Sequence, residues 1–204
     1  MVEKLVELGK VKLVQLQPSG LIIETPSGYY YDESRRVEVD QLIIKSKGIE
    51  AITPDGEHVL DIHHLDHPAK KYDDDDLVCI GFTSHYDKMR ERFGEHMDYG
   101  SAGENIVIEY PDEVWLKDIG DQIGIENQET GQLLILNQVQ IAAPCEEFSH
   151  FAAQRQDERL PAKELKDIIR FLNNGRRGFL LVLGKGQTSG VVKSGDKVYR
   201  IGDG

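Results

Sequence analysis

The chain has 204 residues, of which 24 are Lys or Arg and 36 are Asp or Glu, giving a formal net charge of −12. This length suits one large domain, and no linker or low-complexity segment divides it. So acidic a balance argues against general nucleic-acid binding, which needs a dense cationic surface. With 39% hydrophobic and 29% charged residues, the composition is that of an ordinary globular protein with a real core.

The chain contains two cysteines, Cys79 and Cys145, fewer than a disulfide-held secreted domain of this size usually carries. The N-terminal ten residues alternate charged and apolar side chains, unlike a signal peptide. The longest apolar runs, such as residues 179–183, are too short to span a bilayer. We therefore expect a cytoplasmic protein with free thiols and no membrane contact.

Short strands dominate the pattern along the chain. Alternating or apolar runs predict strands at residues 11–16, 21–25, 29–31, 37–44, 105–109, 122–126, 133–136, 139–144 and 178–183, with the last strands within 191–201. The runs 122–126 and 133–136 flank a polar loop and predict a hairpin. We interpret the Gly-Asp pairs at 120–121 and 195–196 as hairpin turns. The glycine-rich segment 184–190 lacks a Walker sequence and is interpreted as a hairpin connection.

Helices are fewer. Ser84 suits the N-cap of a helix that continues through residues 88–93. A second helix is expected to begin at Pro161, bury the apolar positions 165, 168, 169 and 172, and end near Gly175. A third, short helix follows Cys145. Many short strands with frequent Gly and Pro turns predict a mainly β fold, a barrel or a sandwich.

Cys145 is the first candidate for chemistry. It follows a strand closed by Pro144 and precedes a helix start, where backbone N–H groups favour a thiolate. A thiolate is both a nucleophile and a soft metal ligand. The neighbouring Glu146 and Glu147 oppose ionisation, and a buried structural cysteine is the alternative. Cys79, within an apolar strand, is interpreted as structural.

Three other clusters have two interpretations each. His63, His64 and His67 suit either a zinc site or a loop or pocket wall, although Pro68 ends any helix there. The Asp run 73–76 lacks the pattern of a calcium loop and is interpreted as a solvated charge run. Arg176 and Arg177, with Arg155 and Arg159 as further candidates, suit either an anionic group or ordinary surface salt bridges.

Four stretches resemble, in order, the MOSC domain, the domain found at the C-terminus of molybdenum cofactor sulfurases. They are Gly-Ser-Ala-Gly-Glu-Asn-Ile at 100–106, Ile-Gly-Asp-Gln-Ile at 119–123, Ile-Ala-Ala-Pro-Cys at 141–145, and Gly-Arg-Arg-Gly-Phe at 175–179 followed by Gly190 and Ser-Gly-Asp-Lys-Val at 194–198. Each stretch alone is a weak signal, and their order and spacing over residues 100–201 make the resemblance specific. The glycine- and histidine-containing segment 48–64 also resembles the family's approach to its pocket.

The resemblance implies a closed β-barrel of MOSC type, similar to the pyruvate kinase barrel, formed as a single domain by residues 1–204. It implies that the chain binds the molybdenum cofactor (molybdopterin) and that Cys145 ligates molybdenum, with a small-molecule substrate such as an N-hydroxylated compound. It offers Gly103, Glu104, Asn105, Arg176 and Arg177 as cofactor contacts. Glu104 and Asn105 equally suit a role in fixing a strand start.

The alternative is a non-catalytic sulfur carrier in which Cys145 holds a persulfide for a partner. The chain shows no pyridoxal-phosphate or iron–sulfur module. Either function therefore requires a partner in trans, a redox protein in the first case and a cysteine desulfurase or sulfurase in the second.

Overall fold

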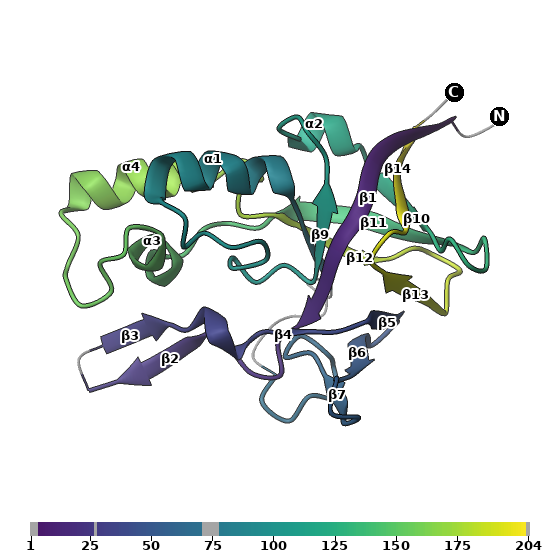
Figure 1. The fold of residues 1–204 in the computed structure, drawn as a ribbon, viewed down its shortest axis with the longest axis horizontal. Helices are drawn as coiled ribbons and strands as arrows, with labels where there is room; N and C mark the ends of the chain where they lie inside the picture. Colours follow the sequence, from purple (N-terminus) through teal and green to yellow (C-terminus); the bar gives the residue numbers. More distant parts are fainter. Residues whose placement is uncertain (1–3, 27, 71–77, 203–204) are drawn as a thin grey trace.

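The computed structural model describes residues 4–26, 28–70 and 78–202. Seven strands within these ranges close into a barrel in the order β1 (Lys4–Leu16), β14 (Lys197–Gly202), β10 (Gln122–Glu126), β11 (Leu133–Ile141), β12 (Phe179–Leu183), β8 (Val78–Phe82) and β9 (Ile106–Glu109), with β9 returning to β1 (Figure 1). Closure leaves these strands with no unpaired edge. The expected mainly β fold with a closed barrel is confirmed.

The remaining elements surround the barrel. A four-stranded sheet contains β13 (Ser189–Lys193), β5 (Gln41–Lys45), β6 (Gly48–Ile52) and β7 (His58–Leu60), and β4 (Val37–Glu38) pairs with the end of β1. The ribbon of β2 (Ile22–Thr25) and β3 (Gly28–Tyr31) extends to one side, below α3 in Figure 1. The helices are a 3-10 turn (Glu33–Arg35), α1 (Thr83–Phe93), α2 (Leu116–Ile119), α3 (Glu146–Ala152) and α4 (Ala162–Leu172).

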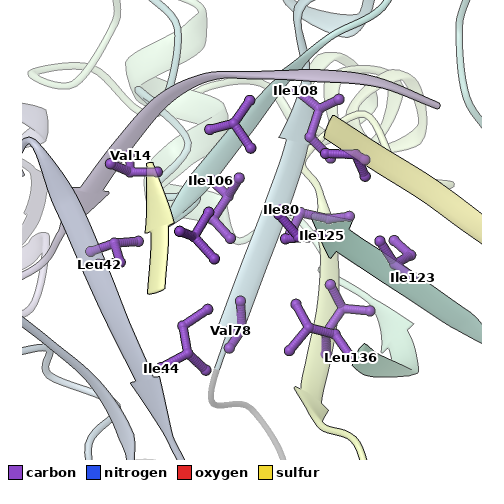
Figure 2. Close-up of a cluster of buried hydrophobic side chains, with 14 of the residues drawn as sticks. Val14, Leu42, Ile44, Val78, Ile80, Ile106, Ile108, Ile123, Ile125 and Leu136 are labelled. Atoms are coloured by element: carbon purple, nitrogen blue, oxygen red, sulfur yellow. The ribbon is translucent and has the colours of Figure 1, made fainter. Parts of the chain in front are cut away.

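Branched apolar side chains fill the barrel. Ile80, Ile106 and Ile125 belong to three different strands and are all at most 1% exposed, and Figure 2 shows them among the labelled core side chains. Every residue of β8 is buried, because β8 has the barrel interior on one face and other parts of the chain on the other. The parallel pair β8–β9 requires a crossover connection, and α1 provides it.

A second apolar cluster lies outside the barrel, where α1, α3 and α4 meet the β2–β3 ribbon. Ile168 and Leu172 of α4 join Phe148 of α3 in this cluster, and the ring of Tyr31 meets that of Phe148 at 5.2 Å. The Tyr31 hydroxyl donates to the Ser101 carbonyl at 2.8 Å, which satisfies its buried polar group. The ribbon and α3 are therefore fixed to each other beside the barrel.

Several local expectations were right and several wrong. The hairpin of β10 and β11 is confirmed, and β11 continues through the strand expected at 139–144 as far as Ile141. The single strand expected at 37–44 instead divides into β4 and β5, because β4 pairs with β1 and β5 pairs with β13 and β6. The segments 184–190 and 194–196 are not hairpin turns, since β12, β13 and β14 do not pair with one another.

The helix ends also differ from expectation. Helix α1 begins directly after Phe82, without a side-chain cap, and the Ser84 hydroxyl donates to the Asp112 carbonyl instead. Helix α4 ends at Leu172 with Asn173 as its C-cap, while Gly175 lies beyond it at φ 107°. No helix in the described ranges is long and apolar enough to cross a membrane. The aspartate run 73–76 lies outside the described residues.

We expect His85 to make stability pH-dependent. It is completely buried against the rings of Phe82, Trp115 and Phe179, and burial lowers its pKa to about 4. The unfolded chain, with an ordinary histidine pKa near 6.5, takes up the proton first as pH falls. This contribution is therefore complete above pH 6.5 and is lost between pH 6.5 and 4, by about 3 kcal/mol in total.

Urea unfolding at pH 7.5 and 4.5 checks this contribution. Carboxylates also titrate in this range, so the informative quantity is the difference between wild type and His85→Gln, whose amide can still accept from the Val114 N–H. The pH-dependent loss should be smaller in the variant by about 2–3 kcal/mol. An equal loss in both proteins would contradict the prediction.

Candidate functional site

A cavity of about 180 Å³ lies where the barrel meets the second apolar cluster. We call it the thiol pocket, because both cysteines line it. Its wall combines segments far apart in the chain, namely Gln17, Leu21, Ile22, Tyr31, His63, Cys79, Gly103, Ala142, Ala143, Cys145, Arg177 and Leu180. Three of the four stretches that resemble the MOSC domain contribute to this wall, through Gly103, Cys145 and Arg177.

Cys145 occupies the position expected from the sequence. It is the N-cap of α3, and its Sγ accepts a hydrogen bond from the Phe148 N–H at 3.4 Å. Burial raises the pKa of the thiol, while the Phe148 N–H and Arg177 lower it and Glu147 raises it further. The net result is a raised pKa, so the thiol keeps its proton near neutral pH until something in the pocket stabilises the thiolate.

The structure separates the two arginines. Arg177 lines the thiol pocket with its guanidinium 5.9 Å from the centre of the Phe148 ring, and its buried Nε has no hydrogen-bond partner among the described residues. Burial opposes its charge, but acidic groups around it outweigh this and raise its pKa, namely Cys79, Tyr31, Glu104 and Cys145. A partly buried cation with an unused donor is suited to an anionic ligand.

Arg176 does not reach this pocket. It forms an ion pair with Glu113 at 2.7 Å, donates to the Phe171 carbonyl at 2.8 Å and lies over the rings of Phe171 and Trp115. These contacts link the segment after α4 to the region of α2. Arg155 and Arg159 do not join Arg177 either, since Arg155 pairs with Glu158 and Glu164, and Arg159 lines a different cavity.

Of the three residues 103–105, only Gly103 lines the pocket. Glu104 is fully buried behind the wall, where its Oε2 accepts from the Tyr86 hydroxyl at 2.6 Å and its Oε1 has no partner among the described residues. Burial raises the pKa of Glu104, although the Tyr86 hydrogen bond lowers it. Asn105 accepts from the Cys79 N–H at 2.9 Å, so it supports the strand that carries Cys79.

The histidines are divided among three environments. His63 lines the thiol pocket, and its Nδ1 is 2.7 Å from the Asp61 carboxylate. The Nδ1 of His64 instead accepts from the Asp66 N–H, and the Nε2 of His67 is 3.1 Å from the Pro18 carbonyl. No group of three or more His, Cys, Asp or Glu side chains in the described part of the chain is placed to hold a metal ion.

Sequence reasoning missed several pocket residues. Cys79 was interpreted as a structural strand residue, and it is one, at 6% exposure in β8, with a pKa that burial raises to about 12. It nevertheless forms part of the wall. Gln17 and Tyr31 gave no signal, because nothing in a single strand or turn indicates which side chain will face a distant cysteine. The Asp-x-His spacing of Asp61 and His63 was the one available local clue.

Comparison with known proteins identifies the family. The MOSC domain model matches residues 67–199. The chain belongs to the MOSC family. This family is generally associated with binding of the molybdenum cofactor. No curated protein matched the sequence.

Several solved structures share the fold at low sequence identity. The YuaD protein of Bacillus subtilis superposes with a TM-score of 0.62 at 12% identity, over 100% of both chains. YiiM of Geobacillus stearothermophilus superposes with a TM-score of 0.50 at 14% identity, over 98% of this chain and 76% of that one. YiiM of Escherichia coli gives a TM-score of 0.50 at 16% identity, over 82% and 65%. These similarities concern the fold.

The residues present fit a soft metal with an anionic substituent. The pocket offers the Cys145 thiol as a soft donor, and the cation Arg177, whose Nε has no partner among the described residues. The molybdenum cofactor would carry a soft metal for the thiol and an anionic phosphate for the cation. Its dithiolene would supply further ligands to the metal.

Proposed function

We propose that this MOSC protein binds the molybdenum cofactor with Cys145 as a molybdenum ligand and Arg177 as the contact for an anionic part of the cofactor. The observation that supports it is the convergence of these two side chains on one cavity from segments 32 residues apart in the sequence. Arg176 and Glu104, in contrast, are engaged by Glu113 and Tyr86 and do not line this cavity.

Ligation by Cys145 requires its proton to leave. The free thiol has a raised pKa because it is largely buried. A metal competes with the proton for sulfur, so binding releases the proton. The Phe148 N–H at 3.4 Å and the charge of Arg177 then stabilise the thiolate, and Glu147 opposes them.

When bound, the cofactor supplies two-electron oxygen-transfer chemistry. We propose that the protein uses it to reduce N-hydroxylated compounds with electrons from a redox partner. The chain itself contributes the cation Arg177 and the small side chains Ala142 and Ala143, which leave space beside Cys145.

The size of the pocket favours a second candidate, the sulfur carrier. About 180 Å³ is less than the roughly 300–1,000 Å³ of a usual small-molecule site. Binding the whole cofactor would therefore require the pocket to widen, whereas a persulfide adds a single sulfur atom to Cys145. Arg177 would stabilise the anionic persulfide in the same way as a thiolate.

Molybdenum analysis of protein expressed in a host that makes the cofactor tests the first proposal. We expect close to one molybdenum per chain in wild type and less than about a tenth of that in Cys145→Ala, because the protein's thiolate ligand is lost. Cys79→Ala is the matched control, since it removes a thiol from the same pocket and should keep the metal. Equal molybdenum in wild type and Cys145→Ala would overturn the ligand assignment.

Absence of molybdenum from wild type would favour the sulfur carrier. Mass spectrometry after incubation with cysteine and a cysteine desulfurase should then show the added mass of one sulfur atom on the peptide that contains Cys145. If neither the metal nor the added sulfur is found, both functions are excluded.

A further inference from the structure

We infer that His63 is the proton donor of the thiol pocket and that Asp61 positions it. This assignment rests on the proposed reduction of N-hydroxylated compounds and adds a residue to it. The side chain of His63 is 19% exposed and lines the same cavity as Cys145 and Arg177. The geometry around Asp61 carries the inference.

Asp61 is a completely buried carboxylate held by four hydrogen bonds. Its Oδ2 accepts from the Gln17 N–H at 2.8 Å and from the Asn105 side-chain amide at 2.9 Å. Its Oδ1 accepts from the His63 N–H at 3.0 Å and is 2.7 Å from Nδ1 of the same residue. Gln17 directly follows β1 and Asn105 directly precedes β9, so the rigid barrel fixes the carboxylate.

This arrangement assigns the tautomer of His63. The two Asp61 carboxylate oxygens accept from three N–H groups, so the Nδ1 of His63 is assigned the hydrogen that points at Oδ1. Nε2, at the other edge of the ring, is then the nitrogen without a hydrogen in the neutral ring. Asn105 thereby also acquires a role. It links the strand that carries Cys79 to the carboxylate that orients His63.

The other groups that face the pocket are poorly suited to this task. Burial raises the pKa of Cys79 to about 12 and also raises that of Tyr31, so both hold their protons near neutral pH. Arg177 remains a cation, because its pKa is raised by its acidic neighbours. Cys145 has the proposed role of metal ligand. Histidine is the side chain that most readily exchanges a proton between pH 5 and 8.

The reaction requires such a donor. Reduction of an N-hydroxylated compound is R–NHOH + 2 e⁻ + 2 H⁺ → R–NH₂ + H₂O. The N–O bond breaks, an external donor supplies both electrons, and the leaving oxygen departs as water. We assign one of the two protons to His63, whose Nε2 delivers it to the leaving oxygen and is then reprotonated from solvent, and the second proton to bulk water.

Turnover of molybdenum-loaded protein with a reduced viologen dye and an N-hydroxylated amidine gives the first test. His63→Gln should retain wild-type molybdenum but lose about 10²- to 10⁴-fold in kcat, the range expected for a lost general acid. His67→Gln is the matched control from the same segment and should keep wild-type kcat. A His63→Gln variant with normal molybdenum and normal kcat would overturn the assignment.

The second test needs neither metal nor turnover. Nitrogen-15 NMR of the histidine rings in metal-free protein should show His63 as the Nδ1–H tautomer when neutral. In Asp61→Asn, the ring should lose this preference and the kcat of loaded protein should fall about 10- to 100-fold. A purely structural Asp61 would change stability without changing the tautomer.

The proposed function and the assignment of His63 can be disproved separately. If wild type binds no molybdenum, the reaction assigned to His63 falls together with the proposed function. The ring tautomer in the metal-free protein still supports or overturns the pairing with Asp61. If wild type binds molybdenum and turns over, but its His63 is the Nε2–H tautomer, the proposed function stands and this inference is wrong.

Discussion

Replacing Arg177 by Met will slow alkylation of Cys145 and weaken retention of the cofactor, whereas the same change at Arg176 will destabilise the fold. The neighbouring residues differ in this way because of their partners. Arg177 lines the pocket with an Nε that has no partner in the described part of the chain, while Arg176 is engaged by Glu113 and Phe171. The sequence places both in one Gly-Arg-Arg-Gly stretch and offers no means of telling them apart.

The effect on Cys145 follows from charge. The Arg177 guanidinium is one of the groups that lower the pKa of this thiol, against the larger opposing effect of burial. Without it, a smaller fraction of Cys145 is thiolate at pH 8, and iodoacetamide alkylation should slow by roughly three- to tenfold. Loss of a charge-assisted hydrogen bond to an anionic group should weaken cofactor retention by about 10- to 100-fold.

Peptide mapping during alkylation measures Cys145 separately from buried Cys79, and molybdenum retention under dialysis measures the second effect. Arg176→Met should leave the alkylation rate within about twofold of wild type. It should lower the free energy of unfolding by about 1–3 kcal/mol, since it breaks a half-buried ion pair and a hydrogen bond to a backbone carbonyl. Equal alkylation rates in wild type and Arg177→Met would contradict the electrostatic argument.

Gly178→Ala should lower the free energy of unfolding by about 2–5 kcal/mol. Gly178 has φ +118°, a conformation that residues with a Cβ rarely adopt. An added Cβ would also lie 2.7 Å from the Ile80 carbonyl oxygen and 3.1 Å from the Sγ of Cys79. The strand β8 would have to move, and because β8 forms one wall of the thiol pocket, the pocket would change with it.

Gly186→Ala is the matched control for this substitution. Gly186 also has positive φ, at +84°, but an added Cβ would meet nothing within 4 Å. Its cost should be limited to backbone strain, about 1–2 kcal/mol. Urea unfolding of both variants separates the steric effect from the conformational one. Equal losses in the two variants would show that the close approach to β8 does not matter.

The local patterns predicted the parts of this fold that depend on neighbouring residues. Apolar alternation and turn residues predicted most of the strands, and the polar loop at 127–132 predicted the β10–β11 hairpin. The Pro144–Cys145 boundary predicted the N-cap of α3. The ordered motifs, with their spacing, predicted the family and therefore the closed barrel. Each of these inferences needed only short-range geometry or a resemblance that extends along the chain.

The sequence did not predict the features that depend on strand partners or on side chains far apart in the chain. The run 37–44 starts with strict alternation and continues into apolar residues without a turn signal, and only its pairing with two different sheets divides it after Glu38. Likewise, 184–190 and 194–196 have turn residues, but strands that follow one another need not pair, and here they enter different sheets. Register and strand order depend on contacts between residues far apart in the sequence, which a periodic pattern does not encode.

For the site, local patterns placed Cys145 at a helix start, and the resemblance to the MOSC domain singled out the two arginines and the Gly-Glu-Asn stretch. Only the folded structure shows that Arg177 and Gly103 line the pocket, whereas Arg176 and Glu104 support other parts of the molecule. It also shows His63 in the pocket wall beside Asp61, which Asn105 helps to hold. The physical reason is that side-chain type sets what a residue can bind. Its neighbours, which barrel closure brings from five or more distant segments, decide whether that capacity is used internally or left for a ligand.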